Sequence, residues 1–67
     1  MTVGEWLIEY QQKNSLTDAD MGSLIGITEN QWDNIRNGVS SVHGPKTRTG
    51  IARAFPELVD QLREELV

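Results

Sequence analysis

Two glycines four residues apart, Gly22 and Gly26, restrict most strongly what this chain can fold into. Gly26 can adopt the positive φ that a tight turn requires, and Gly22 leaves room where a second helix crosses closely over the first. Apolar residues recur at helical spacing on both sides of Gly26. They are Met21, Leu24 and Ile25 before the turn, and Ile27, Trp32 and Ile35 after it. The pattern therefore predicts a helix-turn-helix between Leu16 and Gly38.

Three threonines mark the starts of helices. Thr2 and Thr28 each stand three residues before a Glu or Gln that can complete a capping box. Thr17 is a third N-cap, followed by acidic residues that suit the positive end of a helix dipole. We expect a first helix over about residues 3–13, a second after Thr17, and a third that ends at the left-handed stop Asn37-Gly38.

The C-terminal half predicts two further helices, separated by Pro56. A polar loop from Gly38 to Pro45 leads into a fourth helix that includes residues 51–55. Pro56 suits the first turn of a final helix, in which three leucines recur every four residues: Leu58, Leu62 and Leu66. No strand is predicted. The expected fold class is all-α: a compact bundle of about five short helices in a single domain over residues 1–67, with the helix-turn-helix formed by the second and third.

Composition excludes several classes of protein. The chain has 67 residues and no cysteine, so it has no disulfides, no cysteine-based zinc site and no thiol catalysis. No apolar run is long enough to span a bilayer, and the N-terminus lacks the pattern of a signal peptide. We therefore expect a soluble, cytoplasmic protein with no membrane partner.

The sequence also provides no apparent active site. His43 is the one histidine and has no cysteine or carboxylate close to it in the sequence, so a loop histidine that faces solvent is expected. Ser40 and Ser41 have no base placed to activate them. We expect neither an enzyme nor a bound metal or cofactor.

The charges are unevenly distributed, although the formal net charge is −4. Four of the ten acidic residues lie between positions 57 and 65, and none lies between Asn34 and Pro56. That central stretch instead carries four cations: Arg36, Lys46, Arg48 and Arg53. Such a stretch is either a phosphate-facing surface or a set of solvated side chains.

These patterns together resemble the lambda-repressor-like helix-turn-helix domains, the group that contains phage repressors and Cro proteins. The matching residues are Leu16-Thr17, Met21, Gly22, Ile25, Gly26, Ile27, Thr28, Ile35, Asn37-Gly38 and the run from Ile51 to Phe55. The resemblance implies a small sequence-specific transcriptional regulator that binds double-stranded DNA as a homodimer. A recognition helix over about residues 28–37 would lie in the major groove.

The resemblance also implies roles for individual residues. The positions that would read bases are Glu29, Asn30, Gln31 and Asn34. Those that would hold phosphates are Thr28, Arg36, Ser40, Lys46 and Arg48. Asparagine and glutamine can pair with adenine, and glutamate can accept a hydrogen bond from the cytosine amino group.

The chain departs from the family pattern at several positions. Asp18 stands where many relatives carry a glutamine that contacts a phosphate, and Glu29 and Asp33 add further negative charge. These acids keep open a second hypothesis, in which the fold binds another regulatory protein, as an antirepressor does. Arg48 and Thr49 replace leucines, which predicts a later start for the fourth helix and a longer loop before it.

The leucine stripe of the last helix has two interpretations. Leu58, Leu62 and Leu66 could form the dimer interface, or they could pack on Trp6 and Tyr10 within one chain. Trp6 and Tyr10, four residues apart on the stripe of Val3 and Leu7, are expected in the core, as is Trp32. The exposed position expected for Leu24 is a further candidate contact.

Overall fold

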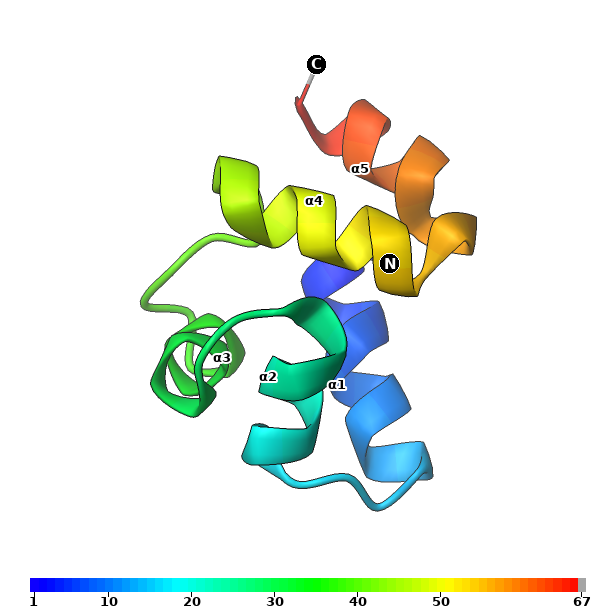
Figure 1. The fold of residues 1–67 in the computed structure, drawn as a ribbon. Helices are drawn as coiled ribbons and strands as arrows, with labels where there is room; N and C mark the ends of the chain where they lie inside the picture. Colours follow the sequence, from blue (N-terminus) through cyan, green and yellow to red (C-terminus); the bar gives the residue numbers. More distant parts are fainter. Residues whose placement is uncertain (67) are drawn as a thin grey trace.

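The computed structural model describes the backbone of residues 1–66 and the side chains of residues 1–65. Within this range the chain forms five α-helices, one short 3-10 helix and no strand (Figure 1). The elements are α1 (Val3–Lys13), α2 (Asp18–Ile25), α3 (Glu29–Arg36), α4 (Pro45–Ala54), η1 (Pro56–Leu58) and α5 (Val59–Leu66). The predicted all-α class is confirmed.

Capping boxes begin each of the first three helices. The hydroxyls of Thr2, Thr17 and Thr28 accept hydrogen bonds from backbone N–H groups three residues on, at 3.0–3.1 Å. The predicted boxes of α1 and α3 are confirmed. At α2 the Asp20 carboxylate also closes a box by accepting from the Thr17 N–H at 3.0 Å. Each box satisfies backbone donors that a helix start leaves free, so local sequence sets where these helices begin.

The turn between α2 and α3 depends on both predicted glycines. Gly26 has a φ of 87°, and the carbonyl of Gly22 accepts from the N–H groups of Gly26 and Ile27 at 2.8 and 2.9 Å. A Cβ on Gly22 would lie 2.8 Å from the Ile27 carbonyl oxygen. The turn therefore folds back onto α2 at Gly22, and α3 leaves at a steep angle to α2.

A third glycine, Gly50, allows α4 to approach α2. A Cβ there would lie 1.8 Å from the Ile25 carbonyl oxygen, a separation that no side chain can adopt. The residues just before Gly50 are polar, so the sequence does not predict this contact. The backbone of α4 thus supports α2, the first helix of the turn.

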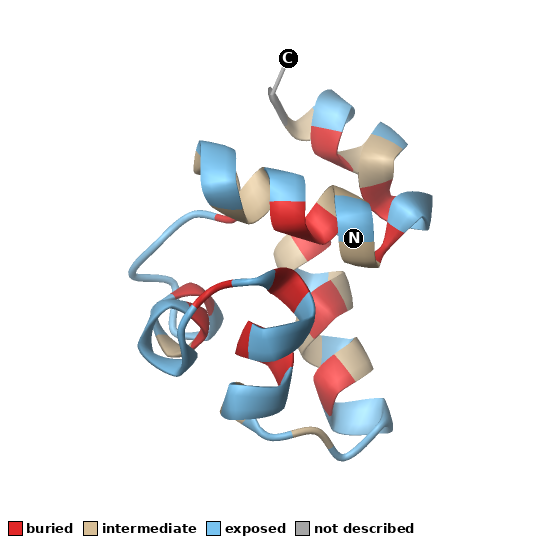
Figure 2. Ribbon diagram, viewed as in Figure 1, coloured by how far each residue is buried: buried red, intermediate tan, exposed pale blue. Residues whose placement is uncertain are grey.

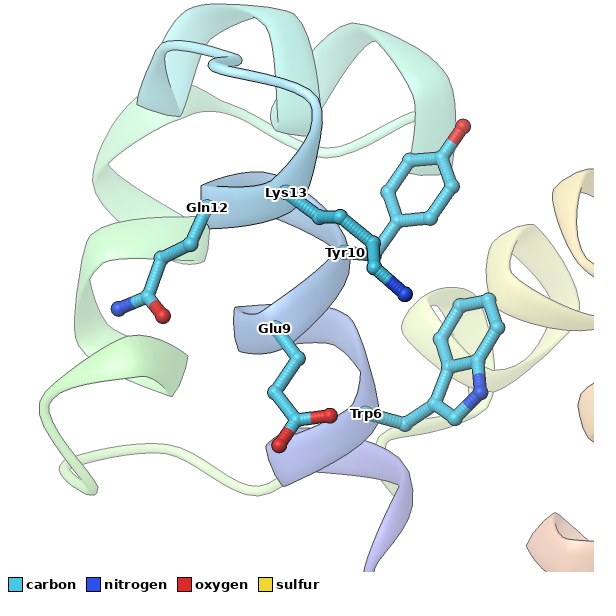
Figure 3. Close-up of a pocket in the computed structure, with 5 residues that line it drawn as sticks. All are labelled: Trp6, Glu9, Tyr10, Gln12 and Lys13. Atoms are coloured by element: carbon cyan, nitrogen blue, oxygen red, sulfur yellow. The ribbon is translucent and has the colours of Figure 1, made fainter.

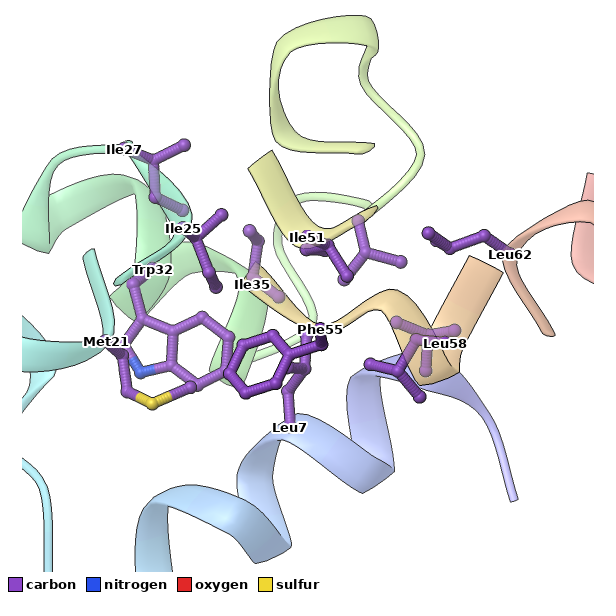
Figure 4. Close-up of a cluster of buried hydrophobic side chains, with 12 residues drawn as sticks. Leu7, Met21, Ile25, Ile27, Trp32, Ile35, Ile51, Phe55, Leu58 and Leu62 are labelled. Atoms are coloured by element: carbon purple, nitrogen blue, oxygen red, sulfur yellow. The ribbon is translucent and has the colours of Figure 1, made fainter. Parts of the chain in front are cut away.

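A single apolar cluster joins all the helices (Figure 4). Trp32, Leu7, Met21, Ile51 and Val3 are completely buried within it. Trp6 and Tyr10 are half-buried at its edge, stacked at 5.5 Å between ring centroids, and both meet Phe55 edge-on. The core position predicted for Trp32 is confirmed, whereas Trp6 and Tyr10 pack against the core and stay partly exposed.

The fourth helix begins earlier than predicted. Arg48 and Thr49 lie inside α4, which starts at Pro45 and follows a correspondingly shorter loop. Proline has the φ of a first helical residue, and the Arg48 N–H donates to the Gly44 carbonyl at 2.8 Å. The start is set by Pro45, and the absence of leucines at positions 48 and 49 does not delay it.

The leucine stripe of α5 faces its own chain. Leu58 and Leu62 are only 4% and 2% exposed, in the same cluster as Val3 and Leu7. The prediction that these two residues form a dimer interface is therefore wrong. The alternative, that they pack within their own chain, is correct for them. Figure 1 shows the reason: after α4 the chain turns back at η1, which packs against α4 and leads into α5. The side chain of Leu66, the third residue of that prediction, lies outside the described residues.

Among residues 1–66, no helix combines the length and the apolar character needed to cross a membrane.

Candidate nucleic-acid interface

The outward side of α3 is entirely polar. Glu29, Asn30, Gln31 and Asn34 are all exposed, whereas Trp32 and Ile35 on the opposite side are buried (Figure 2). The four predicted base-reading residues therefore share an accessible surface, which we call the outer face of α3. The buried pair holds this short helix rigidly against the core.

The capping box of α3 uses part of the hydrogen-bonding capacity of this face. Gln31 accepts from the Thr28 N–H at 2.8 Å, and the Thr28 hydroxyl accepts from the Gln31 N–H at 3.1 Å. The Gln31 amide NH₂ and the Thr28 hydroxyl hydrogen are still able to donate. Asn30 and Asn34 keep both their donors and their acceptors and are the better equipped to pair with a base.

Arg36 does not lie free at the end of α3. Its guanidinium donates to the Asp18 carboxylate at 3.1 Å and also to Asp33 one turn earlier in α3. The hydrogen bond and charge of Asp18, with the charge of Asp33, raise the pKa of Arg36 above its ordinary value. The phosphate contact predicted for Arg36 is not preformed, because two carboxylates already pair with its Nη2 group.

Asp18 is in turn held by a buried hydrogen-bond chain. Gln11 donates to Asp18 at 2.8 Å and to the Leu16 carbonyl at 3.2 Å, while its own oxygen accepts from the Trp32 indole N–H at 3.1 Å. The hydrogen bond from Gln11, followed by that from Arg36, keeps the pKa of Asp18 below the ordinary range. A continuous polar path therefore runs from the core to the surface and links α1, α2 and α3.

Sequence reasoning missed the part played by Gln11, although a signal was present. Val3, Leu7 and Gln11 are spaced by four residues, which puts Gln11 on the buried stripe of α1. A glutamine on such a stripe needs a partner, since a buried amide without hydrogen bonds is costly. The buried indole N–H of Trp32 is that partner.

The remaining predicted phosphate contacts surround α4 and the loop before it. Ser40 and Lys46 are exposed, and no acid among the described side chains pairs with Lys46. Arg48 is half-buried, and its Nε atom has no partner among the described residues. Lys46 also lines a hollow beside the α2–α3 turn together with Arg53 and Gly26. Lys46 and Arg53 therefore lie next to the turn that presents α3, whereas Arg48 lines a different hollow with Val59, Leu62 and Arg63.

His43 differs from its predicted environment. Its Nε2 lies 2.9 Å from a carboxylate oxygen of Glu65, and the ring is half-buried where a solvent-facing ring was expected. Glu65 also accepts from the Val3 N–H at 2.7 Å and from Gln61 at 3.0 Å. Burial raises the pKa of Glu65, but the hydrogen bonds from Gln61, Val3 and His43 outweigh it, so the pKa lies below its usual range. Because 22 residues separate His43 from Glu65, only the fold reveals this pairing.

A separate groove of about 470 Å³ lies on α1 (Figure 3). It is lined by Trp6, Glu9, Tyr10, Gln12 and Lys13. No three His, Asp or Glu side chains in the described part of the chain come together in the manner of a metal site.

Compared with protein-family models, with curated proteins and with solved structures, the chain matches none. Its function is therefore inferred from the outer face of α3 and its surroundings alone.

Proposed function

We propose that this protein is a small sequence-specific regulator that binds double-stranded DNA by inserting α3 into the major groove. One observation carries the proposal: Glu29, Asn30, Gln31 and Asn34 are all exposed on a helix that Trp32 and Ile35 anchor from behind. A rigid helix with an outward polar face, joined by a tight turn to a supporting helix, is the arrangement that reads base edges in a groove.

The chemistry of the outer face favours particular bases. Asn30 and Asn34 lie one helical turn apart, and each amide can bond adenine through N6 and N7. Glu29 accepts hydrogen bonds only, so it suits the amino group of cytosine. We expect an operator in which adenine and cytosine stand at the positions that α3 contacts.

Backbone contacts would come from the two sides of α3. The Thr28 hydroxyl lies at its start, and Ser40, Lys46 and Arg48 follow its end. Hydroxyls and cations in these places fix the register of a reading helix on the duplex without contributing sequence preference.

We infer a homodimer on a two-part operator, acting in the cytoplasm to occlude a promoter. Two half-sites about 34 Å apart, one turn of DNA, would double the phosphate contacts. Because Leu58 and Leu62 pack within one chain, they do not provide the surface for this pairing.

The proposal is tested by selecting from a random duplex pool with the purified protein and retitrating the enriched site with variants. Asn30→Ala and Asn34→Ala should each weaken the enriched site by about 5- to 150-fold, the equivalent of about 1–3 kcal/mol. Asn14→Ala is the matched control, because Asn14 is an exposed asparagine at the C-terminal end of α1 and is not among the residues that line the hollow beside Arg36. It should leave affinity unchanged. No enrichment and no binding at low salt would refute the DNA-binding function.

The arrangement of charge favours a second candidate, a surface that binds a basic protein. Asp18, Asp20, Glu29 and Asp33 surround α2 and α3, against the single cation Arg36 that two of them already bind. Under this alternative, Glu29→Lys abolishes capture of the partner, whereas under the DNA-binding function it strengthens non-specific attraction to duplex DNA.

A further inference from the structure

The ion pairs of Arg36 suggest how the affinity of the proposed DNA-binding surface is set. The Arg36 side chain is 37% exposed, and those of Asp18 and Asp33 are 25% and 44% exposed. All three groups therefore lie at the surface beside the outer face of α3, within reach of an approaching ligand. A phosphate that approaches Arg36 meets a guanidinium whose charge is already balanced by two carboxylates at Nη2.

Asp18 is the fixed member of this group. One of its oxygens is held by Gln11 at 2.8 Å, and Gln11 is locked between the Trp32 indole and the Leu16 carbonyl. The other oxygen is the one that accepts from Arg36. Asp18 is also the first residue of α2, where an anion is favoured by the helix dipole. The chain thus keeps a carboxylate of its own in a position suited to an anion.

Arg36 is the member that can move. It lies in the last turn of α3, and a long flexible side chain there can turn toward solvent once its partners are lost. Neither of its two ion pairs is deeply buried, and exposed pairs of this kind are weak. Removing the carboxylates should free the guanidinium without unfolding the helices.

We propose that Asp18 and Asp33 hold Arg36 as an internal substitute for a DNA phosphate, so that the chain binds DNA with one phosphate contact fewer per subunit than its cations allow. The inference rests on the proposed DNA-binding function and identifies how that site is regulated. It predicts that the chain's affinity for duplex DNA is held low by its own carboxylates and rises when they are neutralised.

Two double variants with equal charge provide the test. D18N/D33N leaves Arg36 without a carboxylate, whereas D20N/D33N removes the same number of charges and leaves Asp18 in place. Asn at position 18 still accepts from Gln11, and Asn at position 20 still caps α2, so both variants keep the local hydrogen bonds. Urea unfolding tests whether each variant is folded. If D18N/D33N is not folded, D33N alone replaces it, because that substitution leaves the buried hydrogen-bond chain of Gln11 intact.

The readout is the slope of log affinity against log salt for one duplex. D18N/D33N should have a slope steeper than that of D20N/D33N by about 0.9 per subunit, the value for one added phosphate contact. Its loss of affinity between 50 and 200 mM salt should then be about 3-fold larger per subunit than that of the control. With D33N alone the slope should steepen by less than 0.9, because Asp18 still holds the guanidinium.

Arg36→Gln, introduced into the wild type and into D18N/D33N, completes the cycle. It should leave the wild-type slope unchanged and abolish the gain of D18N/D33N. A wild-type slope that flattens by about 0.9 would mean that Arg36 already grips a phosphate, and the inference would be overturned. Equal slopes for the two double variants would overturn it as well, while the wild type's own binding would still support the proposed function. Failure of every variant to bind duplex at low salt would overturn both.

Discussion

Substituting Gly50 by alanine tests whether the close approach of α4 to α2 supports the turn. The added Cβ would lie 1.8 Å from the Ile25 carbonyl oxygen and 2.9 Å from its carbon, whereas ordinary contact begins at 3.4 Å. Both obstructing atoms belong to the backbone of α2, so no side-chain rotation relieves the clash. The two helices would have to move apart by about 1.6 Å, the difference between the ordinary contact distance of 3.4 Å and the 1.8 Å that the added Cβ would have.

The expected cost follows from two opposed effects. Overpacking of a rigid core costs about 3 kcal/mol, and replacing glycine by alanine within a helix returns about 1 kcal/mol. The net loss of about 2 kcal/mol is a large part of the roughly 3–5 kcal/mol that a core of this size supplies. The melting temperature should fall by about 10 °C or more.

Thermal unfolding followed by circular dichroism measures this, with Gly4→Ala as the matched control. Gly4 is also helical, but a Cβ there meets only the Thr2 hydroxyl at 3.9 Å. That variant should be more stable than the wild type by about 0.5 kcal/mol. If G50A were as stable as G4A, the close approach of α2 and α4 would not be a real constraint, and the support we assign to the turn would be wrong.

Three further predictions concern the buried polar chain, α5 and the response to acid. Gln11→Leu leaves the buried indole N–H of Trp32 without an acceptor and should lower the free energy of unfolding in urea by about 1–3 kcal/mol. Gln12→Leu, at the exposed neighbouring position, is the control and should change stability by less than about 0.5 kcal/mol. Equal effects of the two substitutions would contradict the role of Gln11. Leu62→Ala should lose about 2–5 kcal/mol while eluting from a sizing column as the wild type does, because Leu62 packs within its own chain; a change in oligomeric state would contradict this. Since the folded-state pKa of Glu65 is lowered, its contribution to stability is complete above the unfolded value of about 4.3 and is lost as the pH falls through the folded value. Urea unfolding from pH 6 down to 3 should therefore show a smaller acid loss for Glu65→Gln than for the wild type, and an unchanged loss would remove Glu65 from the acid response.

Local signals predicted the helices well because their causes lie within a few residues. The capping threonines, the left-handed Gly26 and the proline before the last helix each act on neighbouring backbone groups. The misplaced start of α4 came from weighing the polar residues Arg48 and Thr49 above Pro45. The start of the last helix also differs, because Pro56–Leu58 forms a separate 3-10 helix and α5 begins at Val59. A proline at the first position acts on the backbone directly, whereas apolar spacing acts only through packing.

The exposed residues of α3 could also be predicted, since Trp32 and Ile35 mark the buried side and the rest must face outward. The partners of the charged residues could not be predicted from the sequence. Asp18 and Arg36 are 18 residues apart, and His43 and Glu65 are 22 apart, so neither pair shares a helix turn. Their contacts arise from how α1, α2, α3 and α5 are packed together.

Residue order alone settled the all-α class, the helix starts and the polar face of α3, because periodicity and capping act over one or two helical turns. Tertiary structure decided which charges are free and which surfaces are covered. It bound Arg36 to two carboxylates, buried Leu58 and Leu62 within one chain, and brought α4 against α2 at Gly50. The reason is that the direction and partner of each face depend on the angles between helices, and those angles follow from close contacts between residues distant in the sequence.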